Sequence, residues 1–188
     1  MLIGVENAAR FFHCWDMNRN WPAIFLVVGA FILGGCHKPA AVEPKPLTIE
    51  DILPKSAQPK LPTIKLWLGA QEITAEMAIT TEAGRAGMMF RTNIAENEGM
   101  IFVLPLPQRA SFWMKNCVIP LSCAYIDSDG VILETHDMQA HNTNSIVAGS
   151  ENIRFVLETK QGWFERNNVT TGMVVRTERG TLAETFLR

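Results

Sequence analysis

The chain has 188 residues, of which 47% are hydrophobic and 19% are charged, and its formal net charge is −2 at pH 7. This length leaves room for one domain large enough to build its own hydrophobic core, together with shorter segments. No cluster of lysines and arginines stands out along the chain, and we therefore predict that nucleic acid is not a partner.

An apolar run over residues 21–35 ends with two glycines directly before Cys36. A short basic start, a compact apolar run, small residues and a cysteine are typical of a bacterial lipoprotein signal. The run has about 15 residues, whereas a transmembrane helix needs roughly 20, so an uncleaved anchor and a buried helix are the weaker alternatives. We predict a leader and signal peptide over residues 1–35, with Met17 as the true start and a lipid on Cys36.

The predicted lipid places the protein on the periplasmic face of a membrane, with the membrane itself as a partner. His37 follows the cysteine where an aspartate would indicate retention at the inner membrane, so the outer membrane is the expected location. Residues 36–62 contain six prolines, and repeated proline favours extended, solvated backbone. We predict a semi-rigid tether here, with one capped helical turn over residues 48–53.

The remaining chain, residues 63–188, is predicted to form a single globular domain. Alternating apolar residues and turn signals predict strands over residues 64–68, 73–79, 99–104, 110–115, 121–126, 131–135, 153–158 and 173–176. Two short helices are predicted over residues 80–88 and 162–167. The expected fold is α+β, with a mainly antiparallel curved sheet or a partly closed barrel.

Several of these boundaries depend on particular residues. Gly69 marks the turn of a first hairpin, and the Asp-Gly step at Gly130 suits the turn of a second. Pro105 and Pro107 are predicted to close the strand before them, because proline cannot donate to a ladder. Residues 142–152 are polar and are predicted to form a loop.

Cys117 and Cys123 are the cysteines of the predicted domain. On one continuous strand, six residues span about 20 Å, whereas a disulfide needs Cα atoms within about 7 Å. We predict two buried free thiols; a disulfide, with the chain folding back at Pro120, is the alternative.

Residues 73–175 carry a series of motifs that occur in this order in one known family. They read Gly87-Met88-Met89-Phe90-Arg91, Glu98-Gly99-Met100-Ile101-Phe102, Ser111-Phe112-Trp113-Met114-Lys115-Asn116, Ile119-Pro120-Leu121, Ala124-Tyr125-Ile126-Asp127 with Gly130, and Phe155-Val156-Leu157-Glu158 with Gly162. The stretch resembles the bacterial and archaeal domain of unknown function 192 family. This resemblance implies a β-rich domain that is often exported or tethered, and it implies no activity.

Two positions depart from the pattern of that family. Ser122 stands where the family commonly has aspartate, which counts against metal or proton chemistry at that point. Cys117 stands where threonine is frequent.

The segment around Trp113, Lys115 and Asn116 is the main candidate for a ligand-binding site. Alternation along a strand would place Trp113 and Lys115 on one face, and an aromatic ring beside a cation suits an anionic or carbohydrate-like group. Arg91 is a candidate anion clamp at the same site. In the alternative interpretation Trp113 and Met114 are core residues, Lys115 is solvated, Asn116 shapes a turn, and Arg91 forms a surface ion pair with Glu96 or Glu98.

A copper(I) site is the second hypothesis. Thioether and imidazole side chains suit copper(I) in an exported protein, and the candidate ligands are Met88, Met114, His136, Met138 and His141. The alternative is that the methionines fill an irregular core.

No serine elbow, zinc-protease motif or phosphate loop occurs in the sequence. An uncharacterised envelope enzyme is therefore only the third hypothesis, and no catalytic residue or cofactor is predicted. The leading prediction is a membrane-tethered periplasmic module that binds an unknown ligand or protein.

Overall fold

The computed structural model describes residues 48–187, and they form a curved sheet with short helices around it. Eight strands form the main sheet: β1 (Thr63–Leu68), β2 (Gln71–Ala78), β3 (Glu98–Gln108), β5 (Leu121–Asp127), β6 (Ile132–Met138), β8 (Ile153–Lys160), β9 (Val175–Thr177) and β10 (Gly180–Thr181). A separate small ladder pairs β4 (Ser111–Phe112) with β7 (Ile146–Val147). The helices are α1 (Ile49–Ile52), α2 (Thr81–Ala86), α3 (Trp163–Arg166) and α4 (Leu182–Phe186).

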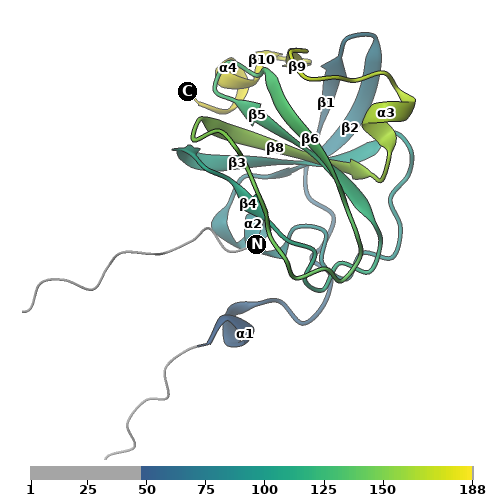
Figure 1. Cartoon of the computed structure of the whole chain (residues 1–188), viewed down its shortest axis with the longest axis vertical. Coiled ribbons are helices and arrows are strands. Elements are labelled where there is room, and N and C mark those ends of the chain that lie inside the picture. The colour runs from purple at the N-terminus through teal and green to yellow at the C-terminus, as the bar shows by residue number, and fades with distance from the viewer. Residues whose placement is uncertain (1–47, 188) are drawn as a thin grey trace, which may run out of the picture.

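The strand order of the main sheet is β10-β9-β1-β2-β3-β8-β5-β6. The β2–β3 pair is parallel, and the other neighbouring pairs are antiparallel. An isolated bridge joins Val131, just before the edge strand β6, to Val174, just before β9 near the other edge, and the sheet curls into a half-barrel (Figure 1). The predicted α+β fold with a curved, mainly antiparallel sheet is confirmed.

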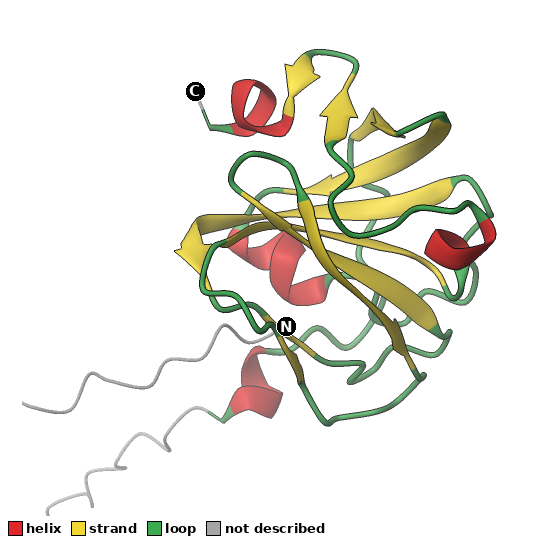
Figure 2. Ribbon diagram, turned by 45° about the horizontal axis from the view of Figure 1, so that its top comes forward, coloured by secondary structure: helices red, strands yellow, loops and turns green. Residues whose placement is uncertain are grey.

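The curled sheet buries side chains on both faces. Phe155 and Leu157 of β8 belong to one core cluster, and Val156 belongs to the other, as the alternation of a strand requires. The cluster of Phe155 and Leu157 lies inside the curl and also takes in Trp163 of α3 and Leu182 of α4. The second cluster covers the outer face, and it includes residues of α2 and of the segments around β4. The helices lie around the sheet and form no layer of their own (Figure 2).

Several predicted boundaries were wrong. β3 continues through Pro105 and Pro107 to Gln108, because the two prolines lie in a register shift between Val103 and Gln108 where no ladder hydrogen bond is needed. The strand predicted over residues 110–115 is only β4, since the chain turns where Asn116 adopts φ 60°.

Secondary structure also occurs where none was predicted. The predicted loop over residues 142–152 contains β7. The capped turn predicted over residues 48–53 is confirmed as α1, and the two predicted helices are α2 and α3, but the described residues contain a fourth helix that was not predicted. The additional C-terminal helix, α4, begins with a capping box in which Thr181 and Glu184 hydrogen-bond each other's backbone N–H groups.

The Pro-rich segment packs against the domain. Leu53 is buried in the outer core cluster, and Nε2 of Gln58 donates hydrogen bonds to the carbonyl oxygens of Ala83 (3.1 Å) and Gly87 (2.9 Å). The predicted signal peptide and the lipid site at Cys36 lie outside the described residues. Within residues 48–187, no helix has both the length and the apolar character needed to cross a membrane.

Candidate functional site

Glu158 is a buried acid in the middle of the main sheet. It lies on β8, an interior strand, directly between Met100 of β3 and Cys123 of β5. Its exposed fraction is 4%, and no group within residues 48–187 forms a hydrogen bond with its carboxyl group. Burial raises the pKa of Glu158 to about 8, so the carboxyl group is mostly protonated and uncharged at pH 7.

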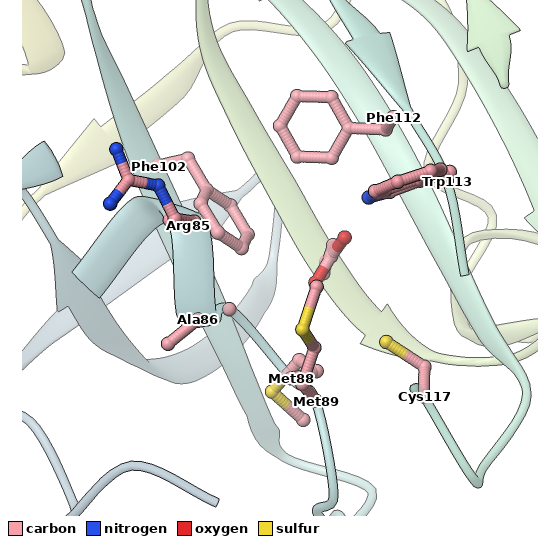
Figure 3. A pocket seen from close by; sticks show the side chains of 10 residues that line it. Arg85, Ala86, Met88, Met89, Phe102, Phe112, Trp113 and Cys117 are labelled. Atoms are coloured by element: carbon pink, nitrogen blue, oxygen red, sulfur yellow. The ribbon is translucent and has the colours of Figure 1, made fainter. Parts of the chain in front are cut away.

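A pocket opens above Glu158, between α2 and the segment after β4. It is small, with room for about one water molecule. We call it the α2 pocket; it is lined by Arg85, Ala86, Gly87, Met88, Met89, Phe102, Phe112, Trp113, Cys117 and Glu158. Arg85 and Phe102 lie on one side of the pocket, and Trp113 and Cys117 lie on the other (Figure 3).

Local structure explains how the segments on the two sides of the pocket are positioned. On one side, α2 ends at Gly87, whose φ of 46° is a conformation that glycine adopts without strain. The chain turns there, and the next two residues, Met88 and Met89, line the pocket. On the other side, the ring of Phe112 packs edge-on against Phe102 and Tyr125, with centroids 5.2 and 5.9 Å apart. This aromatic contact fixes the position of the segment that carries the next wall residue.

The side chain of Trp113 contributes a buried polar group that has no partner among the described residues. Its indole Nε1 is buried and has no hydrogen-bond partner within the described part of the chain. Buried polar groups in folded proteins almost always have partners, and each exception calls for an explanation. Since Trp113 and Glu158 line the same apolar pocket, a bound group that hydrogen-bonds to both would satisfy them.

The structure brings together three of the four predicted ligand-binding residues. Nζ of Lys115 lies 5.5 Å from the centroid of the Trp113 ring, a cation–π contact, and it pairs with Glu50 of α1. Asn116 shapes a turn through its positive φ, and its Nδ2 lies 3.9 Å from the sulfur of Met89. Trp113 therefore lines the α2 pocket, and Lys115 and Asn116 lie beside its lining residues Trp113 and Met89, at what we call the rim of the pocket.

The guanidinium group of Arg91, the fourth predicted residue, forms an ion pair with Glu76 and does not line the α2 pocket. Its Nη2 lies 2.9 Å from Oε2 of Glu76 and 3.3 Å from the carbonyl oxygen of Pro59. The same Glu76 oxygen accepts a hydrogen bond from the backbone N–H of Leu61 (2.8 Å). Arg91 is thus paired with Glu76, and not with the Glu96 or Glu98 considered in the sequence analysis, and it fastens the Pro-rich segment to the domain.

The five candidate copper ligands have different surroundings. Met88, Met114 and Met138 are buried in the outer core cluster, as gap-filling methionines would be. Nε2 of His136 lies 3.0 Å from Oε2 of Glu134, and His141 is an exposed loop residue with φ 61°. Among the five, Met88 is the one that lines the α2 pocket. Residues 48–187 contain no group of three or more His, Cys, Asp or Glu side chains arranged to hold a metal.

Cys117 and Cys123 are both free and buried, in agreement with the prediction of two thiols. Burial raises the pKa of the Cys117 thiol to about 12, and it also raises the pKa of Cys123. Both thiols are therefore protonated at neutral pH and are poor nucleophiles.

Ser122 has a local structural role. Its hydroxyl accepts a hydrogen bond from the backbone N–H of Gly162 (2.8 Å) and donates one to Asp137. His136, in the same open hollow, is hydrogen-bonded to Glu134 and not to Ser122. The Ser122 hydroxyl in this hollow is therefore hydrogen-bonded to a carboxylate and not to the imidazole of a serine–histidine pair.

Sequence reasoning did not single out Glu158 as a site residue. The signal that could have found it is an acidic residue among the apolar residues of the strand predicted over residues 153–158. Such an acid has either a partner or a function, because an unpaired buried charge is costly.

Comparisons with known proteins agree on the fold. The model of the DUF192 family, described as "Uncharacterized ACR", matches residues 64–177. A crystal structure from Sinorhizobium meliloti 1021, described as a candidate transcription regulator, is similar with a TM-score of 0.57 and 28% identity, over 61% of this chain and 92% of that chain. A Novosphingobium aromaticivorans protein of unknown function has a TM-score of 0.55 and 27% identity, over 61% and 83% of the two chains. No curated protein matches the chain.

Proposed function

The chain belongs to the domain of unknown function 192 family, and we propose that this member is a membrane-tethered periplasmic module that binds a small ligand in the α2 pocket. The observation that carries the proposal is the Trp113 indole N–H, which is buried without a hydrogen-bond partner among the described residues and lines the same pocket as the largely buried Glu158 carboxyl group. A buried acid without a partner costs folding free energy. Ligand binding gives a reason for retaining that cost in an otherwise apolar core.

The pocket is narrow, with room for about one water molecule in this conformation. It therefore suits a small group, or the head of a larger ligand whose remainder stays at the mouth. Lys115 and Asn116 at the rim are placed to contact such a remainder.

Native mass spectrometry of the full chain, purified from membranes in an uncharged detergent, tests the pocket. We expect an added mass that disappears on denaturation and is lost in Trp113→Phe, which removes the indole N–H and keeps an aromatic ring. The matched control is Trp67→Phe on β1, which does not line the pocket and should retain the added mass. A bare mass for the wild type, or equal retention in both variants, would count against the proposal.

Copper(I) binding is a second candidate function, because three sulfur side chains line the same pocket. They belong to Met88, Met89 and Cys117, and sulfur ligands select copper(I), which would displace the proton of the Cys117 thiol. This set differs from the five ligands inferred from the sequence, which combined Met88, Met114 and Met138 with His136 and His141. In the same native spectra, an added mass of one copper ion would select this function.

Membrane attachment through a lipid on Cys36 completes the proposal, with the outer membrane as the expected location. Replacing this residue, Cys36→Ser, should move the protein from the membrane fraction to the soluble fraction, which immunoblotting of fractionated cells would measure. Unchanged membrane association would point to an uncleaved anchor over residues 21–35.

The regulatory role ascribed to the Sinorhizobium neighbour is not part of this proposal. A net charge of −2 does not favour binding to nucleic acid.

A further inference from the structure

We infer that the ligand of the α2 pocket is a small monocarboxylate, held by its carboxylate group between Trp113 and Glu158. This inference rests on the proposed function, since it names the ligand class of the same site.

The polar groups inside the pocket call for a hydrogen-bond acceptor. The indole Nε1–H of Trp113 can only donate, and it is buried without an acceptor. The Glu158 carboxyl group, 4% exposed and without a partner within residues 48–187, donates a second hydrogen bond when it is protonated. A carboxylate offers two acceptor oxygens to these two donors, and a hydrogen bond from a carboxylic acid to a carboxylate is charge-assisted and short.

The pocket disfavours a cation as its ligand. Its buried indole N–H group can only donate a hydrogen bond, and the cationic end of Lys115, which also pairs with Glu50, lies over the Trp113 ring. The remaining walls, which include Phe102 and Phe112, are apolar. Because the pocket has room for about one water molecule, the carboxylate head would enter it and a short hydrocarbon tail would stay at the mouth.

Protonation of Glu158 makes binding depend on pH. The pKa of Glu158 is about 8, so about one tenth of the molecules are protonated at this position at pH 9. The other titratable groups that interact with it are Cys117, Cys123 and Tyr125, whose pKa values are also raised by burial, and they stay uncharged between pH 6 and 9. Ionised Glu158 would repel a carboxylate.

The indole N–H resonances of the ¹⁵N-labelled full chain in maltoside micelles and carboxylate-free buffer provide the test, with propionate as the probe. We expect propionate to shift one resonance, the one that Trp113→Phe removes, in a saturable way. The affinity should fall about tenfold between pH 6 and pH 9, in proportion to the protonated fraction of Glu158. Propionamide, with nearly the same shape and no charge, should bind more weakly.

The conservative variant Glu158→Gln keeps an N–H donor at this position but cannot ionise. It should bind propionate with an affinity that does not change between pH 6 and pH 9. An unchanged pH dependence in this variant, or no saturable shift with propionate at pH 6, would overturn the inference, and so would equal affinity for propionamide.

The two proposals can fail separately. If native spectra show an added mass that Trp113→Phe removes while propionate causes no shift, the pocket remains a binding site and the ligand is not a carboxylate. Binding of copper(I) that tightens as the pH rises would likewise replace the carboxylate with a metal ion. Bare native spectra together with no propionate response would overturn both proposals.

Discussion

The free energy of unfolding is expected to fall as the pH rises from about 4.5 to 8, and the Glu158→Gln variant is expected to lack this component. The pKa of Glu158 rises from 4.5 to about 8 in the folded protein because the side chain is buried. The folded state therefore binds this proton more tightly than the unfolded state. The resulting stabilisation is fully present below pH 4.5, is lost as the pH rises toward 8, and amounts to on the order of 5 kcal/mol.

Urea unfolding of both proteins at pH 5, 6, 7, 8 and 9 measures this difference. Glu158→Gln should be similar to the wild type in stability at the acidic end and several kcal/mol more stable above pH 8. Exposed Glu72, which pairs with Lys65 at the surface, gives the matched control, because Glu72→Gln should leave the shape of the pH curve unchanged. Parallel curves for the wild type and Glu158→Gln would show that the acid is not held in its neutral form.

Carboxylates with lowered pKa values affect the free energy of unfolding at a lower pH than Glu158 does. The ion pair with Arg166 lowers the pKa of Glu96, and hydrogen bonds from the Ala95 backbone and Lys60 lower that of Glu98. Their stabilisation is lost only as the pH falls below about 4.5. The comparison above pH 5 therefore isolates the buried acid.

The sequence predicted those parts of the fold that depend on local signals. The period-two alternation on both sides of Gly69 gave the hairpin of β1 and β2, and the Asp-Gly step at Gly130 gave the hairpin of β5 and β6. The contact between Trp113 and Lys115 was also expected, although the reason differs. They meet across a turn that begins after β4, and not along a continuous strand.

Features that depend on which strands become neighbours could not be predicted from the sequence. Glu158 lies in an apolar environment because β8 pairs with β3 on one side and β5 on the other. These strands are far apart in the chain, and no local pattern fixes their register. In the same way, Glu76 becomes the partner of Arg91 through packing of distant segments, whereas Glu96 and Glu98 were the candidates by proximity in sequence.

Loss of the Arg91–Glu76 pair is expected to destabilise the domain strongly. Both side chains are largely buried, with exposed fractions of 12% and 10%, and Arg91→Met would leave the Glu76 carboxylate without its main cation. Breaking a buried pair by removing one partner typically costs about 3 kcal/mol or more. The variant should therefore lower the free energy of unfolding in urea at pH 7 by about 3 kcal/mol, less whatever Lys60, 3.7 Å from Glu76, compensates.

The exposed pair of Lys65 and Glu72, at 2.7 Å, is the control for this experiment. Lys65→Met should cost less than about 1 kcal/mol, because solvent screens exposed charges. Combining Arg91→Met with Glu76→Gln should recover part of the loss, since no buried charge is then left unpaired. Equal losses for Arg91→Met and Lys65→Met would contradict the structural role assigned to Arg91.

The same pair should control how the Pro-rich segment is held. Glu76 accepts the backbone N–H of Leu61, and Arg91 donates to the carbonyl oxygen of Pro59. Arg91→Met should therefore increase amide hydrogen exchange over residues 55–61, while exchange in β8 changes only as far as global stability falls. This segment also leads back to α1, where Glu50 pairs with Lys115 at the rim of the α2 pocket. Arg91 thus supports the pocket indirectly, by holding the segment that reaches its rim.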